Sequence, residues 1–211
     1  MNINVIQPGT PEEVMFNIFS RINTGGLSMN NQEIRHAFNA VPVREFLKDL
    51  VSTEEFLSAT KRSVTDKRMF ARECALRFLA FFLVEWREYK NNDLGGFLNA
   101  TMKKINELDG DQPAELKSIF QNSMIASRRV LGDDAFRKRY HEGAPRSPIS
   151  KALFETWSVA LAKLEKRISI IWLVVAVRFV RHFPKLLIRI KILKSQYPTQ
   201  LVFPLEFISA S

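Results

Sequence analysis

The stretch DKRMFARECALRFLAFFLVEWREY, residues 66–89, decides the fold. On an α-helix its apolar side chains cover two adjoining faces and leave little of the circumference for water. We therefore expect residues 66–89 to form the central, buried helix of the protein. One face holds Phe70, Cys74, Phe78, Phe81 and Phe82, and the other holds Met69, Leu76, Leu79, Leu83 and Trp86.

The charged residues of this helix have two interpretations. Glu73 and Arg77 are spaced i to i+4, so their side chains can meet on one side of the helix and form an ion pair. Charges embedded in an apolar helix need partners wherever they lie, which favours a structural pair. The alternative is a polar site lined by Arg68, Arg72 and Arg77.

Upstream of this segment the sequence predicts a helix, a stop and a second helix. Residues 10–22 place apolar side chains at helical spacing, and residues 23–26 (Asn-Thr-Gly-Gly) end that helix. Asparagine and glycine suit this position because they tolerate the left-handed backbone of a helix exit. Asn30 or Ser28 can cap the next helix, which places Glu33 about one turn inside it. This junction is the best candidate for a site.

The remaining pattern predicts a mainly α-helical, multi-helix bundle. A short strand at Ile3, Asn4 and Val5 precedes the helices. Loops are expected at residues 109–113 and 143–148, where glycine, aspartate and proline gather. Further helices are expected at residues 43–51, 53–61, 94–108, 114–130 and 149–166.

Several classes of chemistry are not expected from this sequence. It contains no phosphate-binding loop of the Walker type and no H-E-x-x-H motif. The three histidines are far apart and Cys74 is the one cysteine, so we assign no catalytic and no metal-binding residue. A single cysteine cannot form an intrachain disulfide, and the first residues lack a secretory signal, which together favour a reducing, cytoplasmic location.

The basic character of the chain lies in its last part. The formal net charge is +9, and residues 166–211 alone contribute +7. Their apolar run is shorter than the about 20 residues that span a bilayer, and a membrane is not an expected partner of the chain as a whole. Three interpretations of this tail remain: binding to an anionic membrane surface or nucleic acid, an ordinary buried helix, or an out-of-frame or degenerate end.

Residues 19–35, FSRINTGGLSMNNQEIR, resemble the signature F-x-R-x-N-T-G-G-x-x-L-x-x-x-E-I-R of the GmrSD-type family. These are prokaryotic restriction and phage-defence proteins whose N-terminal region has a ParB/sulfiredoxin-like fold. The resemblance runs from about residue 3 to about residue 165. The other matching segments are residues 66–68, 73–81, 97–99, 130–138 and 152–155.

The chain departs from the family pattern in two ways. Met29 stands where the family usually has leucine. The D-G-Q-Q-R motif, which the family ties to nucleotide hydrolysis, does not occur, and the H-N-H nuclease of fuller members is not recognisable. We therefore expect a truncated member: residues 1–40 are the remnant of the ParB-like nucleotide-handling region, 41–165 a helical extension and 166–211 a basic apolar tail.

The resemblance implies a nucleotide or phosphate site at the junction. The residues that would hold the anion are Arg21, Asn23, Thr24, Gly25, Gly26 and Arg35. In the alternative interpretation Asn23 caps the helix, the two glycines supply positive φ angles and Arg35 is solvated. The positions of the signature that we expect to be structural are Phe19, Glu33, Ile34, Asp66, Arg68, Glu73 and Arg77.

The expected function is a scaffold that forms one side of a nucleotide pocket and does not catalyse by itself. The resemblance implies that complete relatives couple hydrolysis of a nucleoside triphosphate, with Mg²⁺, to cleavage of modified or foreign DNA. Hydrolysis needs groups that position water and stabilise charge on phosphate, and the motif linked to that task is missing. The alternative is a binding module whose partners are DNA or a second chain that supplies the missing half and pairs with residues 3–5.

Overall fold

The computed structural model describes residues 5, 7, 9–22, 28–84, 89, 93–139 and 145–165. This part of the protein is mainly α-helical, as predicted, and it contains no strand beyond one isolated antiparallel bridge between Arg137 and Ile149. The α-helices are α1 (Glu12–Ile22), α2 (Asn31–Phe38), α3 (Val41–Ser52), α4 (Glu54–Ala59), α5 (Phe70–Leu83), α6 (Leu94–Asn106), α7 (Gln112–Leu131) and α8 (Lys151–Glu165), and two 3-10 turns are η1 (Lys67–Met69) and η3 (Gly132–Asp134).

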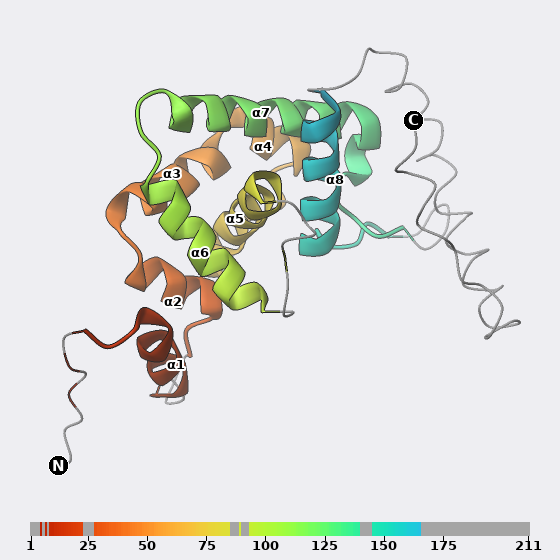
Figure 1. Ribbon diagram of the computed structural model, residues 1–211. Coiled ribbons are helices and arrows are strands. Elements are labelled where there is room, and N and C mark those ends of the chain that lie inside the picture. Colours follow the sequence, from red (N-terminus) through yellow and green to blue (C-terminus); the bar gives the residue numbers. More distant parts are fainter. Residues whose placement is uncertain are drawn as a thin grey trace, which may run out of the picture.

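Helix α5 lies at the centre of the bundle, as predicted, but it is shorter than the predicted helix at 66–89. It ends at Leu83, because Val84 has extended backbone angles (φ −120°, ψ 134°), and residues 85–88 lie outside the described part. Helices α3, α6 and α8 pack against it (Figure 1). Burial extends around most of the helix because apolar side chains occupy several of its faces. The fully buried residues of α5 are Cys74, Ala75, Leu76, Phe78, Leu79 and Ala80.

An aromatic cluster joins α5 to the helices around it. The ring of Phe78 on α5 meets Phe120 on α7 edge to face, with centroids 5.1 Å apart. Phe120 also stacks on Phe56 of α4 at 6.1 Å, and Phe56 meets Phe154 of α8 at 6.0 Å. All four side chains are at most 1% exposed, so this cluster is the centre of the core.

Helix α5 begins at Phe70 and not at Asp66, where the apolar pattern placed its start. Arg68 and Met69 both have a φ of 56°, a left-handed conformation that residues other than glycine adopt rarely. The chain therefore turns sharply between η1 and α5. The Asp66 carboxylate closes this turn by accepting hydrogen bonds from the backbone N–H of Arg72 at 3.4 Å and from its Nε at 2.6 Å.

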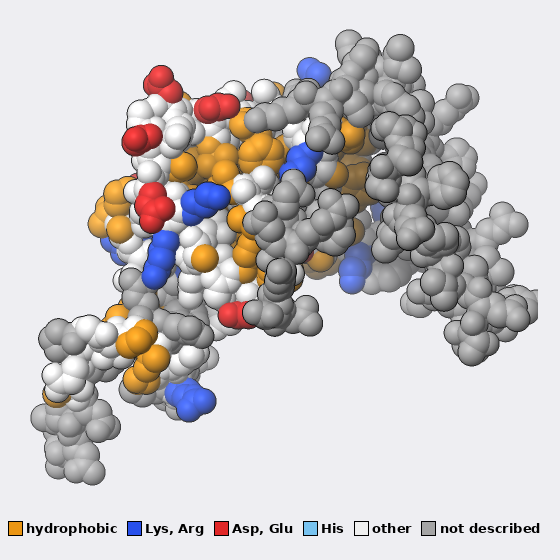
Figure 2. Space-filling view, in the orientation of Figure 1, with side chains coloured by type: hydrophobic (Ala, Val, Ile, Leu, Met, Phe, Trp, Pro, Cys, Tyr) orange, Lys and Arg blue, Asp and Glu red, His pale blue; other side chains and the backbone are white. Residues whose placement is uncertain are grey.

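Helices α1 and α2 form an arm beside the bundle (Figure 1). Phe19 of α1 meets Phe38 of α2 edge to face, with ring centroids 5.2 Å apart. Val14 and Phe38 nevertheless remain 44% and 38% exposed, and Figure 2 shows apolar side chains gathered over α1. The arm therefore presents an apolar surface to solvent.

Some predictions concern residues outside the described part of the chain. Ile3 and Asn4 of the predicted strand are among them, whereas Val5 is described, is 72% exposed and belongs to no strand. A lone strand has no neighbour for its backbone groups, which explains why Val5 is irregular. The tail at 166–211 lies outside the described residues as well. Within the described helices, none has the length and apolar character needed to cross a bilayer.

Replacing Phe120 with alanine tests the core. We expect Phe120→Ala to lower the free energy of unfolding by about 3–5 kcal/mol, because it removes a fully buried ring and leaves a cavity among the other three. Ile125→Ala is the control, since Ile125 lies on the same helix but is 37% exposed, and it should cost about 1 kcal/mol or less. Urea unfolding followed by circular dichroism measures both, and equal costs would contradict this account of the core.

Candidate functional site

The junction before α2 is held to η1 by one carboxylate. Glu33 accepts a hydrogen bond from the backbone N–H of Asn30 at 2.6 Å and an ion pair from Arg68 at 2.9 Å. The Asn30 side chain caps α2 in return and donates to the backbone oxygen of Arg68 at 2.8 Å. Arg68 also donates to the backbone oxygen of Ser28 at 2.5 Å. The hydrogen bond from Arg68, followed by that from Asn30, lowers the pKa of Glu33.

The predicted phosphate loop at this junction is only partly described. Asn23, Thr24, Gly25 and Gly26 lie outside the described residues, so their proposed contacts remain a prediction. Arg21 is exposed in the last turn of α1. The described chain therefore resumes at Ser28, directly beside the Arg68 ion pair.

Arg35 is buried, which contradicts the alternative interpretation in which it is solvated. It is 4% exposed, because the spacing of three residues places it on the same face of α2 as Gln32, which is 1% exposed. Arg35 Nη1 donates to Gln32 Oε1 at 2.9 Å. Among the described residues, Arg35 Nε and Gln32 Nε2 have no hydrogen-bond partner. Burial lowers the pKa of Arg35.

No carboxylate of the described residues lies within ion-pair distance of Arg35. Glu73 and Asp93 act on it only through longer-range attraction, which opposes the effect of burial on its pKa. A buried guanidinium without a close anion is energetically unfavourable. Arg35 is therefore a buried cation with donor capacity that the described part of the chain does not satisfy.

Helix α5 carries a second polar cluster that joins it to α8. Arg77 binds Glu73 at 3.0 Å, as its i to i+4 spacing predicted, and also binds Glu155 of α8 at 3.0 Å. Lys151 of α8 binds the other oxygen of Glu73 at 2.5 Å. Burial opposes the charged form of Glu73, but the hydrogen bond and charge of Lys151 and the charge of Arg77 lower its pKa. The cluster is therefore an inter-helix tie in which every charge has a partner.

The alternative interpretation of the charged residues is a polar site lined by Arg68, Arg72 and Arg77, and the structure shows which carboxylate each of them binds. Arg68 binds Glu33, Arg72 binds Asp66 at 2.6 Å and Arg77 binds Glu73 and Glu155. Each guanidinium thus has its own carboxylate. In the described structure these three residues stabilise the fold and do not converge on one ligand.

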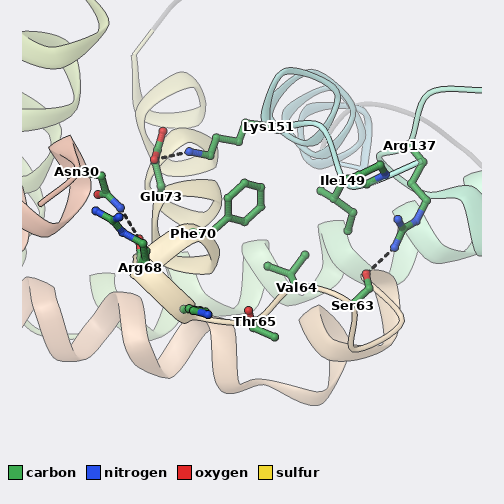
Figure 3. Close-up of a pocket in the computed structure, with 12 residues that line it drawn as sticks. Asn30, Ser63, Val64, Thr65, Arg68, Phe70, Glu73, Arg137, Ile149 and Lys151 are labelled. Atoms are coloured by element: carbon green, nitrogen blue, oxygen red, sulfur yellow. Dashed lines mark hydrogen bonds and ion pairs between the residues drawn. The ribbon is translucent and has the colours of Figure 1, made fainter. Parts of the chain in front are cut away.

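A cavity of about 500 Å³ lies between the η1 region and the segment that leads into α8. Figure 3 shows Arg137 and Ser63 at one end, Glu73 and Lys151 at the other, and Val64, Phe70 and Ile149 between them. Sequence reasoning missed this cavity because its lining comes from three distant segments with no common motif. The lining residues are Asn30, Ser63, Val64, Thr65, Lys67, Arg68, Phe70, Glu73, Arg137, Pro148, Ile149 and Lys151.

The buried Cys74 thiol and the arrangement of potential metal ligands bear on two further kinds of chemistry. Burial raises the pKa of the Cys74 thiol to about 12, so the reactive thiolate is suppressed. Among the described residues, no three His, Cys, Asp or Glu side chains are arranged to hold a metal ion.

No protein-family model, no curated protein and no solved structure matches this chain. The resemblance to GmrSD-type proteins consequently rests on the sequence motifs alone.

Arg77→Gln tests the tie between α5 and α8. We expect it to lower the free energy of unfolding by about 3 kcal/mol, because it leaves Glu155 without a cation in a setting where its side chain is 19% exposed. Arg62→Gln is the matched control: it breaks the Arg62–Glu54 pair, whose side chains are 64% and 70% exposed, and should cost less than about 1 kcal/mol. Similar losses in urea unfolding would show that the tie contributes no more than a surface pair.

The lowered pKa of Glu33 predicts that the stability of the protein depends on pH. Because its folded pKa lies below the ordinary value of 4.5, its contribution is fully present above that pH and is lost as the pH falls through the lower, folded value. Glu33→Gln should destabilise the protein by about 1–2 kcal/mol at pH 7 and by progressively less below pH 4.5. Unfolding midpoints from pH 7 to pH 3 measure this, and the exposed Glu107→Gln serves as control. A difference from wild type that does not shrink in acid would contradict the assignment.

Proposed function

We propose that this chain is the helical scaffold of a GmrSD-type DNA-restriction or phage-defence protein, and that its junction between α1 and α2 binds the phosphate of a nucleotide. The observation that carries the proposal is Arg35, the last residue of the signature, which is 4% exposed and has no ion pair with any described residue. A phosphate group would supply the anion that this guanidinium lacks.

The donors near Arg35 fit such a ligand. Arg35 Nε and Gln32 Nε2 are both buried, and neither has an acceptor in the part of the chain that the structure describes. Buried donors without acceptors are rare in folded proteins, and a bound ion or ligand is one physical explanation for them. Asn23 and the backbone amides of residues 24–26, which precede α2 in the sequence, would complete the set of donors.

The carboxylates nearby support binding without hydrolysis. Glu33 and Glu73 are each held by cations, and these contacts lower the pKa of both groups. A carboxylate with a lowered pKa is a weak general base, so neither is suited to activating water. Hydrolysis of a nucleoside triphosphate, with Mg²⁺, would then need residues that a partner supplies. The buried thiol of Cys74 is compatible with action in the cytoplasm.

The arm offers a place for that partner, which is the second candidate role of this chain. Val14 and Phe38 of the arm and Val41, the first residue of α3, are 44%, 38% and 55% exposed, which leaves their apolar side chains available for contact with a partner. A chain that supplies the D-G-Q-Q-R half could cover them. The protein would then be a binding module that becomes active, on DNA, only in the complex.

Nucleotide titration tests the proposal. We expect the purified chain to bind ATP or GTP with Mg²⁺, to release no phosphate, and to lose at least tenfold in affinity in Asn23→Ala, because a donor to phosphate is removed. Arg129→Gln, which neutralises an exposed cation on α7, should bind as wild type does. Isothermal titration calorimetry and a phosphate-release assay measure these outcomes.

Two results would overturn the proposal. Equal affinity in wild type and Asn23→Ala would remove the junction as the binding site. Robust turnover by the isolated chain would contradict the assignment of hydrolysis to a partner.

A further inference from the structure

The cavity between η1 and α8 lies apart from the predicted phosphate loop and has its own composition. Its volume of about 500 Å³ falls within the range of about 300–1,000 Å³ that is usual for small-molecule sites. It shares no residue with Arg21, residues 23–26 or Arg35. The cavity is therefore distinct from the predicted phosphate site at the junction.

The lining of the cavity is cationic. Lys67, Arg68, Arg137 and Lys151 line it, and Glu73 is the carboxylate of its described lining. Arg68 pairs with Glu33 and Lys151 with Glu73, so Lys67 and Arg137 are the lining cations that no described carboxylate neutralises. Both oxygens of Glu73 already accept from cations, one from Arg77 and the other from Lys151. The carboxylate cannot balance the charge of the other end of the cavity, so a positive potential remains there.

Arg137 lies at one end of the cavity, and its hydrogen-bond acceptors among the described residues are uncharged. Its guanidinium donates to the hydroxyl of Ser63 at 2.5 Å and to the backbone oxygen of Ser147, which are both neutral acceptors. Among the described residues no carboxylate lies within ion-pair distance of it. Burial and then the charge of Arg146 lower the pKa of Arg137, whereas Asp134 opposes them. The Ser63 hydroxyl accepts from Arg137 and donates its own proton to the backbone oxygen of Thr60, so Arg137 is the donor at this end of the cavity (Figure 3).

The middle of the cavity is apolar. Val64, Phe70 and Ile149 lie between the Arg137 end and the Glu73–Lys151 end (Figure 3). The Lys151 ammonium lies 4.7 Å from the centre of the Phe70 ring, which holds both side chains in place. An ionic end next to an apolar wall suits a ligand that has both characters, and a free inorganic ion would leave the wall uncovered.

We infer that this cavity binds a phosphate ester, with the phosphate on Arg137 and the organic part against Val64, Phe70 and Ile149. A guanidinium matches phosphate oxygens, because its planar group can donate two parallel hydrogen bonds. Lys67, which is exposed at the cavity and pairs with no described carboxylate, adds a second charge. The ester can be a free nucleotide or the phosphorylated end of a nucleic acid strand.

Matched ligands and variants test this inference on the full chain. The ligand pairs are AMP with adenosine, and 5′-phosphorylated with unphosphorylated oligothymidylate, so that phosphate is the difference within each pair. Arg137→Gln and Lys67→Gln remove charge from the cavity, and Val64→Trp fills its middle without changing a charge. Arg129→Gln removes an equal charge from an exposed position on α7 outside the cavity. Circular dichroism and thermal melting establish that each variant is folded.

We expect the phosphorylated member of one pair to bind at least tenfold more tightly than its partner, and Arg137→Gln to remove that preference. Val64→Trp should weaken binding at least tenfold, Lys67→Gln should weaken it less, and Arg129→Gln should not change it. Preference within the AMP pair identifies a nucleotide as the source of the phosphate, and preference within the oligothymidylate pair identifies a strand end. If Arg137→Gln does not fold, Lys67→Gln and Val64→Trp decide the question.

The test also separates this site from the junction. Binding that survives Asn23→Ala and is lost in Arg137→Gln or Val64→Trp supports the cavity. Binding that is lost in Asn23→Ala and unchanged in the cavity variants overturns the inference and leaves the proposed function intact. Equal binding of phosphorylated and unphosphorylated ligands, or equal weakening in Arg129→Gln, also overturns it.

Discussion

The structure depends on the pairing of two charges on a helix that has almost no solvent-facing side. Helix α5 is buried around most of its circumference, so Glu73 and Arg77 cannot keep their charges by reaching water. They bind each other, and Lys151 and Glu155 of α8 complete the set. Because breaking a buried pair costs far more than breaking a surface pair, this cluster contributes, together with the aromatic core, to fixing how α8 lies on α5.

By the same reasoning, Arg35 is the exception among the buried charges, and the proposed function rests on it. Around it, Glu33, Asp66, Glu73 and Glu155 all have cationic partners, and the pairs join segments far apart in the chain. Arg35 is more deeply buried than any of them but has no such partner among the described residues. Violations of an otherwise consistent pattern are expected at functional sites, where a ligand or partner completes the set.

Local patterns in the sequence predicted the central helix, the Asn30 cap and the Glu73–Arg77 pair, because each depends on residues within a few positions of one another. The Arg68–Glu33 pair spans 35 positions and the Arg77–Glu155 pair spans 78, so no local spacing of residues predicts either pair. The start of α5 moved to Phe70 because of the left-handed turn at Arg68 and Met69, which hydrophobic periodicity does not reveal. The burial of Arg35 and the cavity at Arg137 arise from packing between distant segments, which is why the sequence alone assigned Arg35 to solvent or a ligand and missed the cavity.

Arg68 connects the junction to the cavity. Its side chain binds Glu33 at the entrance of α2, its backbone oxygen accepts from Asn30, and it lines the cavity whose other end holds Arg137. Its left-handed backbone is held by these contacts, since a residue in that conformation persists only where its surroundings fix it. The carboxylates of this region are already bound to cations, while Arg35 and Arg137 have no such partner in the described chain. Arg35 and Arg137 are therefore the two residues on which both proposals of anion binding rest.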